Sequence, residues 1–239
     1  MIGRRLLWIV ARAVLRITFI LAFRVRVFGQ LNVPRRGGVL IVSNHQSYLD
    51  PALLSLGFER SVSFMARRTL FRNPAFGRLI AALNAFPVTR GGLDIAAMRE
   101  AVRRLQNGEC LVVFPEGTRT SDGSIAPLHP GILAIVERAN VPIVPAVIEG
   151  AFEAWPRGST PRANEISVLY GRAIRPEEHS RLSRAELVER LQSELSRLET
   201  ELRKRKICSR IGAVSVRQDR PEYGTGSFGS RQCAGPPGS

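Results

Sequence analysis

The sequence predicts an α/β fold: a single domain with a largely parallel β-sheet flanked by helices, preceded by an amphipathic N-terminal helix. From residue 37 onward, short β-rich runs alternate with stretches of helical periodicity, the pattern of strands joined by crossover helices. The length of 239 residues fits one domain that can bury a sizeable core. The residues before 30 are largely apolar, but arginine interrupts them repeatedly.

The predicted strands are short apolar runs, and helical patterns lie between or after them. Strands are expected at residues 39–42, 62–65, 111–114, 144–148 and 166–170. Helices are expected near residues 51–57, 74–83, 93–106, 130–139 and 183–206. We divide the chain into an N-terminal helix (1–29), a folded domain (30–207) and a basic tail (208–239). The tail is rich in Gly, Ser, Pro and Arg and is expected to be disordered.

The formal net charge of +15 is concentrated at the two ends of the chain. Residues 1–36 hold eight Arg and no acidic residue, and residues 203–239 hold eight basic and two acidic residues. Between them, 19 basic and 18 acidic residues nearly cancel. A nucleic-acid-binding body would itself be basic, so we expect no nucleic-acid partner. Basic ends on a neutral body favour an anionic membrane surface.

The segment from Leu6 to Phe23 is apolar but carries Arg12 and Arg16. It lacks the ~20 uninterrupted apolar residues of a spanning helix, and the arginines also fit a cleavable signal peptide poorly. On a helical wheel, Arg5, Arg12 and Arg16 fall within about 40° of one another, and apolar residues fill the rest. This predicts a helix lying in the membrane interface. The alternative is a helix packed on the body with solvated arginines.

The chain has three cysteines, Cys110, Cys208 and Cys233, and their number and spacing indicate neither a disulfide framework nor a metal site. This favours a reducing compartment. Cys110 lies in an apolar run and is expected to be a small core residue.

A first candidate site follows the strand at 39–42, in the segment Ser43-Asn44-His45-Gln46-Ser47-Tyr48-Leu49-Asp50. Loops at the carboxyl ends of parallel strands usually carry the active sites of α/β proteins. If the loop folds back, the carboxylate of Asp50 can accept the imidazole N–H of His45, which makes His45 a general base. The alternative is structural: Asp50 caps the helix that Pro51 begins, and His45 merely ends a strand.

A second candidate site follows the strand at 111–114 and contains Glu116, Gly117, Thr118 and Arg119. Glycine permits close approach of the backbone to a ligand, Thr118 can donate a hydrogen bond, and Arg119 can hold a phosphate with two N–H groups. Glu116 can bind a hydroxyl group or orient Arg119. The alternative is a turn with a surface ion pair between Glu116 and Arg119.

Two weaker signals complete the set. Arg90 lies before two glycines, in a region (60–104) that holds nine Arg and two acidic residues, which favours an anionic ligand over a solvated basic face. The segment 141–145 reads Val-Pro-Ile-Val-Pro and by itself indicates only a strand with a rigid start.

Taken together and in this order, the segments 44–50, 86–91, 114–119 and 141–145 resemble the conserved blocks of the lysophosphatidate acyltransferase family of glycerolipid acyltransferases. The resemblance covers roughly residues 30–150. One departure is Leu128-His129-Pro130-Gly131, where many members have a basic residue in a stretch similar to Phe-Lys-x-Gly. That change bears on the headgroup of the acceptor rather than on the chemistry.

The resemblance implies that His45 is the general base and Asp50 its partner, and that Arg90, Glu116, Gly117, Thr118 and Arg119 bind the acceptor. It implies transfer of an acyl group from acyl-CoA or acyl carrier protein to the sn-2 hydroxyl of lysophosphatidic acid, giving phosphatidic acid, with no metal and no cofactor. We expect a membrane-associated protein on the cytoplasmic face of the inner (plasma) membrane. The alternatives are another lysolipid acceptor, such as a lyso-ornithine lipid, or a non-catalytic protein that binds anionic membranes.

Overall fold

A computed structural model describes residues 17, 22–56, 60–89, 94–156 and 158–218, and of residues 207–218 it describes the backbone alone. Three predictions therefore lie wholly or partly outside the described residues. These are the amphipathic helix, most of which falls in 1–21, Arg90, and the tail from residue 219. Among the described residues, no helix combines the length and the apolar character needed to cross a bilayer.

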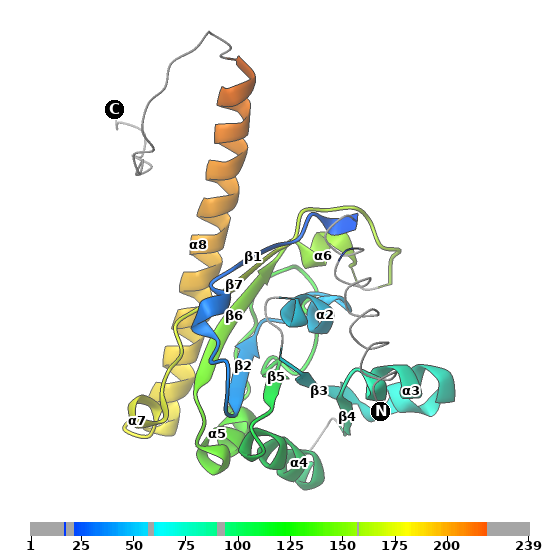
Figure 1. The fold of residues 1–239 in the computed structure, drawn as a ribbon, viewed down its shortest axis with the longest axis vertical. Helices are drawn as coiled ribbons and strands as arrows, with labels where there is room; N and C mark the ends of the chain where they lie inside the picture. The colour runs from blue at the N-terminus through cyan, green and yellow to red at the C-terminus, as the bar shows by residue number, and fades with distance from the viewer. Residues whose placement is uncertain (1–16, 18–21, 57–59, 90–93, 157, 219–239) are drawn as a thin grey trace.

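A seven-stranded sheet in the order β1-β7-β6-β2-β5-β3-β4 forms the centre of the fold (Figure 1). All neighbouring strands are parallel except β6 and β7. The largely parallel α/β sheet predicted from the sequence is therefore confirmed. The strands are β1 (Arg26–Phe28), β2 (Val39–Ser43), β3 (Val62–Arg67), β4 (Ala85–Val88), β5 (Cys110–Val113), β6 (Ile143–Glu149) and β7 (Ser167–Tyr170).

Helices cover both faces of this sheet. The α-helices are α2 (Asp50–Ser55), α3 (Pro74–Ala82), α4 (Ile95–Gln106), α5 (Leu133–Ala139), α6 (Ala151–Ala154), α7 (Pro176–His179) and α8 (Arg184–Gln218). Short 3-10 helices lie at η1 (Gln30–Asn32), η2 (Arg68–Arg72) and η3 (Pro130–Ile132). The long helix α8 runs along β6 and β7, whereas α3 lies beside β4 at the other end of the sheet (Figure 1).

The central strand β2 shows why the sheet is buried on both sides. Leu40 and Val42 pack into the core that α4, α5 and α8 cover, while Val39 and Ile41 pack into the core that α2 and α6 cover. Successive side chains of a strand point to opposite faces, so a strand covered on both faces is apolar throughout. This explains the uninterrupted apolar run that predicted the strand.

Two predicted boundaries are wrong. Residues 26–28, assigned to the N-terminal helix, form β1 and pair with β7, because Arg24-Val25-Arg26-Val27 alternates with the period of a strand. Helix α8 continues to Gln218, beyond the expected end of the domain at 207. Its sequence there contains no proline before Pro221, so the helix can propagate.

Tyr170 in β7 connects the sheet to the helix that carries Asp50. Its side chain is buried, and its hydroxyl donates a hydrogen bond of 2.7 Å to the backbone carbonyl of Leu54 in α2. The contact spans 116 residues of sequence and fixes α2 against the sheet.

Replacing Tyr170 with phenylalanine removes the donor to this buried carbonyl and is expected to lower the free energy of unfolding by about 1–2 kcal/mol. Urea denaturation followed by circular dichroism measures the change. Tyr48→Phe, at a side chain that is 53% exposed, is the matched control and is expected to leave stability unchanged. Equal stabilities for Tyr170→Phe and the wild type would show that the hydrogen bond does not hold α2.

Candidate active site

The two predicted site loops leave neighbouring strands at the same edge of the sheet. Strands β2 and β5 are adjacent and parallel, with Val42 opposite Val113. The loop 44–49 follows β2 and the loop 114–123 follows β5. Because carboxyl ends of parallel strands meet at one edge, the pairing brings together segments that are about 70 residues apart in sequence, as in other open α/β sheets.

The imidazole of His45 lies against the carboxylate of Asp50, with 2.7 Å between Nδ1 and Oδ2. The same oxygen accepts the backbone N–H groups of Gln46 at 2.6 Å and Ser47 at 2.8 Å. Asp50 is fully buried, and a carboxylate only accepts hydrogen bonds, so the N–H of His45 is on Nδ1. This leaves Nε2 as the basic nitrogen. It has no hydrogen-bond partner among the described residues.

The alternative role of Asp50 as a helix cap does not match the geometry. Helix α2 begins at Asp50 itself, its N-cap position is Leu49, and no side chain caps it. The carboxylate instead points back to the loop that contains His45. Pro51 occupies the first turn, where a missing N–H is tolerated. The Asp-Pro sequence is therefore typical of a helix N-cap, but here the aspartate orients His45 instead of capping α2.

His45 is held through its backbone as well as its ring. Its N–H donates to Oε1 of Glu116 at 2.8 Å, and its carbonyl accepts the N–H of Thr120 at 2.8 Å. The ring stacks on Phe114, with 4.1 Å between ring centroids and an interplanar angle of 16°. All three contacts come from the loop after β5. That loop therefore fixes the position of the histidine that the β2 loop supplies.

Asn44 and Gln46 tie the histidine loop to the elements on its other side. The side chain of Asn44 exchanges two hydrogen bonds with the backbone of Ile148 in β6, at 2.9 and 2.8 Å. Gln46 donates to the carbonyl of Gly123 at 3.2 Å and accepts the N–H of Phe152 at 3.3 Å. Neither residue received a role from the sequence, because their partners are distant in the chain.

Glu116, predicted to bind substrate, is buried beneath the loop of His45. Its side chain is buried, with 4% exposed, and its two oxygens accept the N–H groups of His45 and Ala126 at 2.8 and 3.3 Å. Burial raises the pKa of its carboxyl group to about 7, although these hydrogen bonds act in the opposite direction. Glu116 therefore positions the loops around His45 instead of facing a ligand, and it forms no ion pair with Arg119.

Gly117 and Thr118 lie at the exposed turn of the same loop. Gly117 has a φ of 70°, which favours glycine, and a Cβ at this position would lie 3.2 Å from Cδ2 of His129. Both residues are exposed, as is His129. The departure from the family pattern at His129 thus lies directly beside the predicted acceptor site.

Arg119 has a buried side-chain nitrogen, Nη1, without a hydrogen-bond partner among the described residues, as Asp50 has a buried oxygen, Oδ1. The guanidinium carbon lies 3.5 Å from the centroid of the Tyr48 ring, and Tyr48 in turn packs against Trp155 with 5.4 Å between centroids. The aromatic face holds a cation whose hydrogen bonds are not satisfied, an arrangement suited to an anionic ligand.

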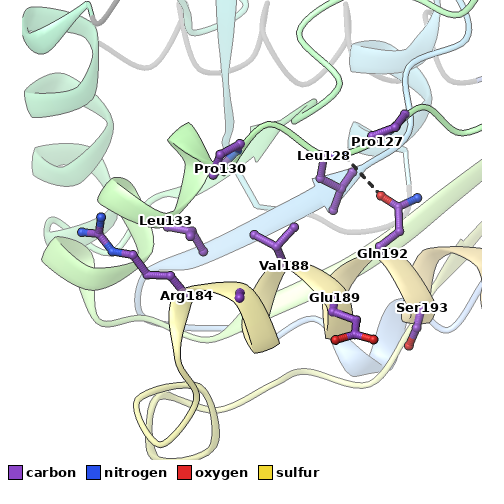
Figure 2. A pocket seen from close by; sticks show the side chains of 10 residues that line it. Pro127, Leu128, Pro130, Leu133, Arg184, Val188, Glu189, Gln192 and Ser193 are labelled. Carbon is purple, nitrogen blue, oxygen red and sulfur yellow. Dashed lines mark hydrogen bonds between the residues drawn. The ribbon is translucent and has the colours of Figure 1, made fainter.

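A separate apolar hollow of about 630 Å³ lies where the loop after Ala126 meets α8 (Figure 2). Leu128, Leu133 and Val188 contribute its apolar walls, and the N–H of Leu128 donates to Gln192 at 3.2 Å. None of the predicted site residues lines this hollow. The N–H of His129, next to Leu128, donates to the carbonyl of Pro115 at 2.9 Å and so links the wall of the hollow to the loop after β5.

Comparisons with known proteins agree with this geometry. The family model described as Acyltransferase matches residues 24–149, slightly more than half of the chain and including all four blocks. The chain belongs to the lysophosphatidate acyltransferase family. The resemblance deduced from the four blocks is therefore confirmed.

The named relatives are acyltransferases that act on 1-acyl-sn-glycerol 3-phosphate. The protein from Bacillus subtilis is 32% identical over 53% of this chain and 63% of its own length. The protein from Pseudomonas aeruginosa is 30% identical over 75% of this chain and 70% of its own. The first four curated relatives are matched over between 35% and 63% of their lengths.

A solved structure of the family has the same architecture. The crystal structure of the 1-acyl-sn-glycerophosphate acyltransferase PlsC from Thermotoga maritima superimposes with a TM-score of 0.65 and 31% sequence identity. The superposition covers 77% of this chain and 74% of that protein.

The raised pKa of Glu116 predicts a pH dependence of stability. Between pH 4.5 and about 7 the folded protein keeps a proton on Glu116 that the unfolded chain releases, so this carboxyl group lowers stability as the pH rises through that window. The glutamine of Glu116→Gln does not titrate. Relative to this variant, the free energy of unfolding of the wild type is expected to fall between pH 4.5 and about 7 and to change little at higher pH. Urea unfolding of both proteins across this range measures the difference, and a pH-independent difference would contradict the prediction.

Proposed function

We propose that this protein transfers a fatty acyl group from acyl-CoA or acyl carrier protein to the sn-2 hydroxyl of lysophosphatidic acid, which gives phosphatidic acid. The observation that carries the proposal is the hydrogen-bonded pair of His45 and Asp50. In this pair, Nε2 of His45 has no hydrogen-bond partner among the described residues. Binding an anionic headgroup requires no general base. A buried carboxylate that orients a histidine is an arrangement for proton transfer.

In the proposed reaction, Nε2 of His45 takes the proton of the acceptor hydroxyl as its oxygen attacks the thioester carbonyl. An oxygen–carbon bond forms, the carbon–sulfur bond of the tetrahedral intermediate breaks, and the thiolate leaves and recovers the proton. Asp50 stabilises the imidazolium that exists between these steps. The acyl group passes directly between the two substrates, and no acyl-enzyme forms.

Arg119 is proposed to bind the phosphate of the acceptor. Its buried Nη1 and its position over Tyr48 support this role. Gly117 and Thr118, at the exposed turn before it, are proposed to contact the same headgroup. Arg90 is proposed as a second phosphate ligand. In sequence Arg90 follows β4, whose carboxyl end lies at the same edge of the sheet as the ends of β2 and β5.

The proposed place of action is an anionic membrane surface on the cytoplasmic side. The acceptor is a lipid, and the sequence before residue 37 contains eight Arg and no acidic residue. No metal or cofactor is proposed, because the proton transfer and the departure of a thiolate need neither.

Replacing His45 with alanine is expected to reduce turnover by ~10²–10⁴, and Asp50→Asn by a similar factor, because the base or its orientation is lost. Release of CoA from acyl-CoA with lysophosphatidic acid measures the rate, and mass spectrometry identifies the product. His179→Gln, at a histidine whose ring contacts the carbonyl of Val141 away from the site loops, is the control and is expected to retain turnover. Circular dichroism establishes that each variant is folded.

Wild-type turnover that persists in folded His45→Ala would contradict the proposed mechanism. Equal turnover of a lysolipid without phosphate, such as a lyso-ornithine lipid, would contradict the role of Arg119. A folded wild type that binds anionic vesicles but turns over no lysolipid with either donor would favour the non-catalytic alternative.

The contact between Tyr48 and Arg119 predicts that a change at Tyr48 alters KM for the acceptor more than kcat. Tyr48→Leu removes the aromatic face and is expected to raise the KM for lysophosphatidic acid about three- to thirtyfold with little change in kcat, the range of a cation–π contact. Tyr48→Phe keeps the ring and is expected to match the wild type. If the Phe variant is impaired as much as the Leu variant, the hydroxyl group is responsible, and the proposed role of the ring is wrong.

A further inference from the structure

The elements η2 and α3 carry exposed apolar side chains at one end of the sheet. Phe76, Leu79 and Leu83 are 44%, 56% and 41% exposed, and Leu70 in η2 is 38% exposed. Residues three, four and seven apart share one face of a helix, so Phe76, Leu79 and Leu83 form a single stripe. Isolated exposed apolar residues are common, but a continuous stripe of large side chains indicates a contact surface.

The opposite side of α3 shows how the helix is attached. Gly77 is the buried residue of α3, and a Cβ there would lie 3.1 Å from the backbone carbonyl of Phe71. Asn73 caps the helix by accepting the N–H of Phe76 at 3.1 Å. The helix therefore packs on η2 through its smallest residue and directs its largest apolar side chains outward.

The charge around this stripe is predominantly positive, and Asp94, which interacts electrostatically with Arg68, is an acidic neighbour. Residues 60–89 contain five Arg and no acidic residue. Arg67, Arg68, Arg72 and Arg78 are exposed, and none of them forms a salt bridge with a described residue. The surface of α8 differs, because its arginines are paired: Arg197 with Glu194, Arg203 with Glu199 and Arg205 with Glu201.

We propose that the η2–α3 surface, formed by Leu70, Phe76, Leu79 and Leu83 with Arg67, Arg68, Arg72 and Arg78, docks on an anionic lipid bilayer. The apolar side chains enter the interface, and the arginines contact the headgroups. The proposal rests on the proposed function for its choice of a lipid partner. It assigns that contact to a part of the folded domain, in addition to the N-terminal segment.

Charge complementarity selects the bilayer over two other occupants. The N-terminal segment of this chain is apolar, but residues 1–36 contain eight Arg and no acidic residue. That segment would bring further positive charge to a positive surface. A second copy of the same surface would do likewise. An anionic bilayer complements both the apolar stripe and the unpaired arginines.

The position of the surface also fits a lipid substrate. Helix η2 begins directly after Arg67, at the carboxyl end of β3, and β3 is parallel to β5 and β5 to β2. The start of the surface and the loop of His45 therefore lie at the same edge of the sheet. A bilayer in contact with η2 and α3 would lie beside the edge of the sheet at which the acceptor hydroxyl must reach Nε2 of His45.

Sedimentation of the full-length protein with vesicles tests the proposal. The vesicles contain phosphatidylcholine with or without phosphatidylglycerol. Two double variants are each expected to lower the partition coefficient on anionic vesicles about tenfold. One carries Phe76→Ser and Leu79→Ser, and the other carries Arg72→Gln and Arg78→Gln. The controls change exposed residues at the opposite edge of the sheet: Leu31→Ser, and Arg175→Gln with Arg181→Gln, two arginines that follow β7. Binding unchanged in the η2–α3 variants, or lost equally in the controls, would overturn the proposal.

A fluorescent probe separates the bilayer from the other occupants. An environment-sensitive dye is attached at Leu79→Cys in a chain with Cys208→Ser and Cys233→Ser, where the remaining Cys110 is buried. The dye is expected to emit as it does in water when vesicles are absent, and as it does in an apolar environment when anionic vesicles are present. Apolar emission already present without vesicles means that protein covers the surface, and aqueous emission from vesicle-bound protein means that the surface stays off the bilayer. Either result overturns the proposal.

These measurements require no turnover. If the wild type fails to acylate any lysolipid, the proposed function fails while the docking result is still obtained. If turnover is observed but the η2–α3 variants bind vesicles as the wild type does, the docking surface alone is wrong.

Discussion

The buried carboxylate of Asp50 accepts hydrogen bonds from the ring of His45 and from the amides of Gln46 and Ser47, all through Oδ2. A carboxylate removed from water is costly unless donors surround it, so the loop must fold back on itself to supply them. That folding places the imidazole with Nε2 as its basic nitrogen. The contacts to Oδ2 offset part of the cost of burying Asp50, whose Oδ1 has no hydrogen-bond partner among the described residues, and they fix the tautomer and the direction of the histidine.

The sheet topology supplies the rest of the scaffold. Strand β2 lies between β5 and β6, so the loop after β2 has a partner on each side. The β5 side contributes Glu116, which binds the N–H of His45, and the β6 side contributes Ile148, which pairs with Asn44. Held from both sides, the loop need not reorganise during proton transfer, which is the condition for an efficient general base. Glu116 matters here as a support for the loop, although its sequence block had predicted a ligand.

The distribution of charge divides the molecule into two unlike ends. Helix α8 crosses β6 and β7 with arginines that glutamates neutralise, as in the pair of Arg203 and Glu199. The other end, at η2 and α3, presents unpaired arginines beside exposed apolar side chains. A surface whose charged side chains are paired is compatible with water, whereas an apolar stripe bordered by cations is compatible with an anionic membrane interface. Arg203 and Arg205, near the middle of α8, therefore belong to the balanced surface.

The sequence by itself determined the parts of this protein that depend on local patterns. Apolar runs predicted β2, β3, β5, β6 and β7 but not the half-exposed edge strand β4, and the spacing of His45, Asp50 and the three later blocks predicted the family. Tertiary structure decided which side chains face one another. Whether Asp50 caps a helix or orients His45 depends on how a loop folds back. Whether Glu116 meets a ligand or the N–H of His45 depends on β5 lying beside β2. The position of Tyr48 against Arg119 follows from the same pairing. Local propensity and periodicity are properties of neighbours in the chain. The contacts of Glu116 and Arg119 join residues about 70 apart, so only the folded sheet brings them together. The contact of Asp50 with His45 spans five residues, but it needs a loop that folds back between two neighbouring strands.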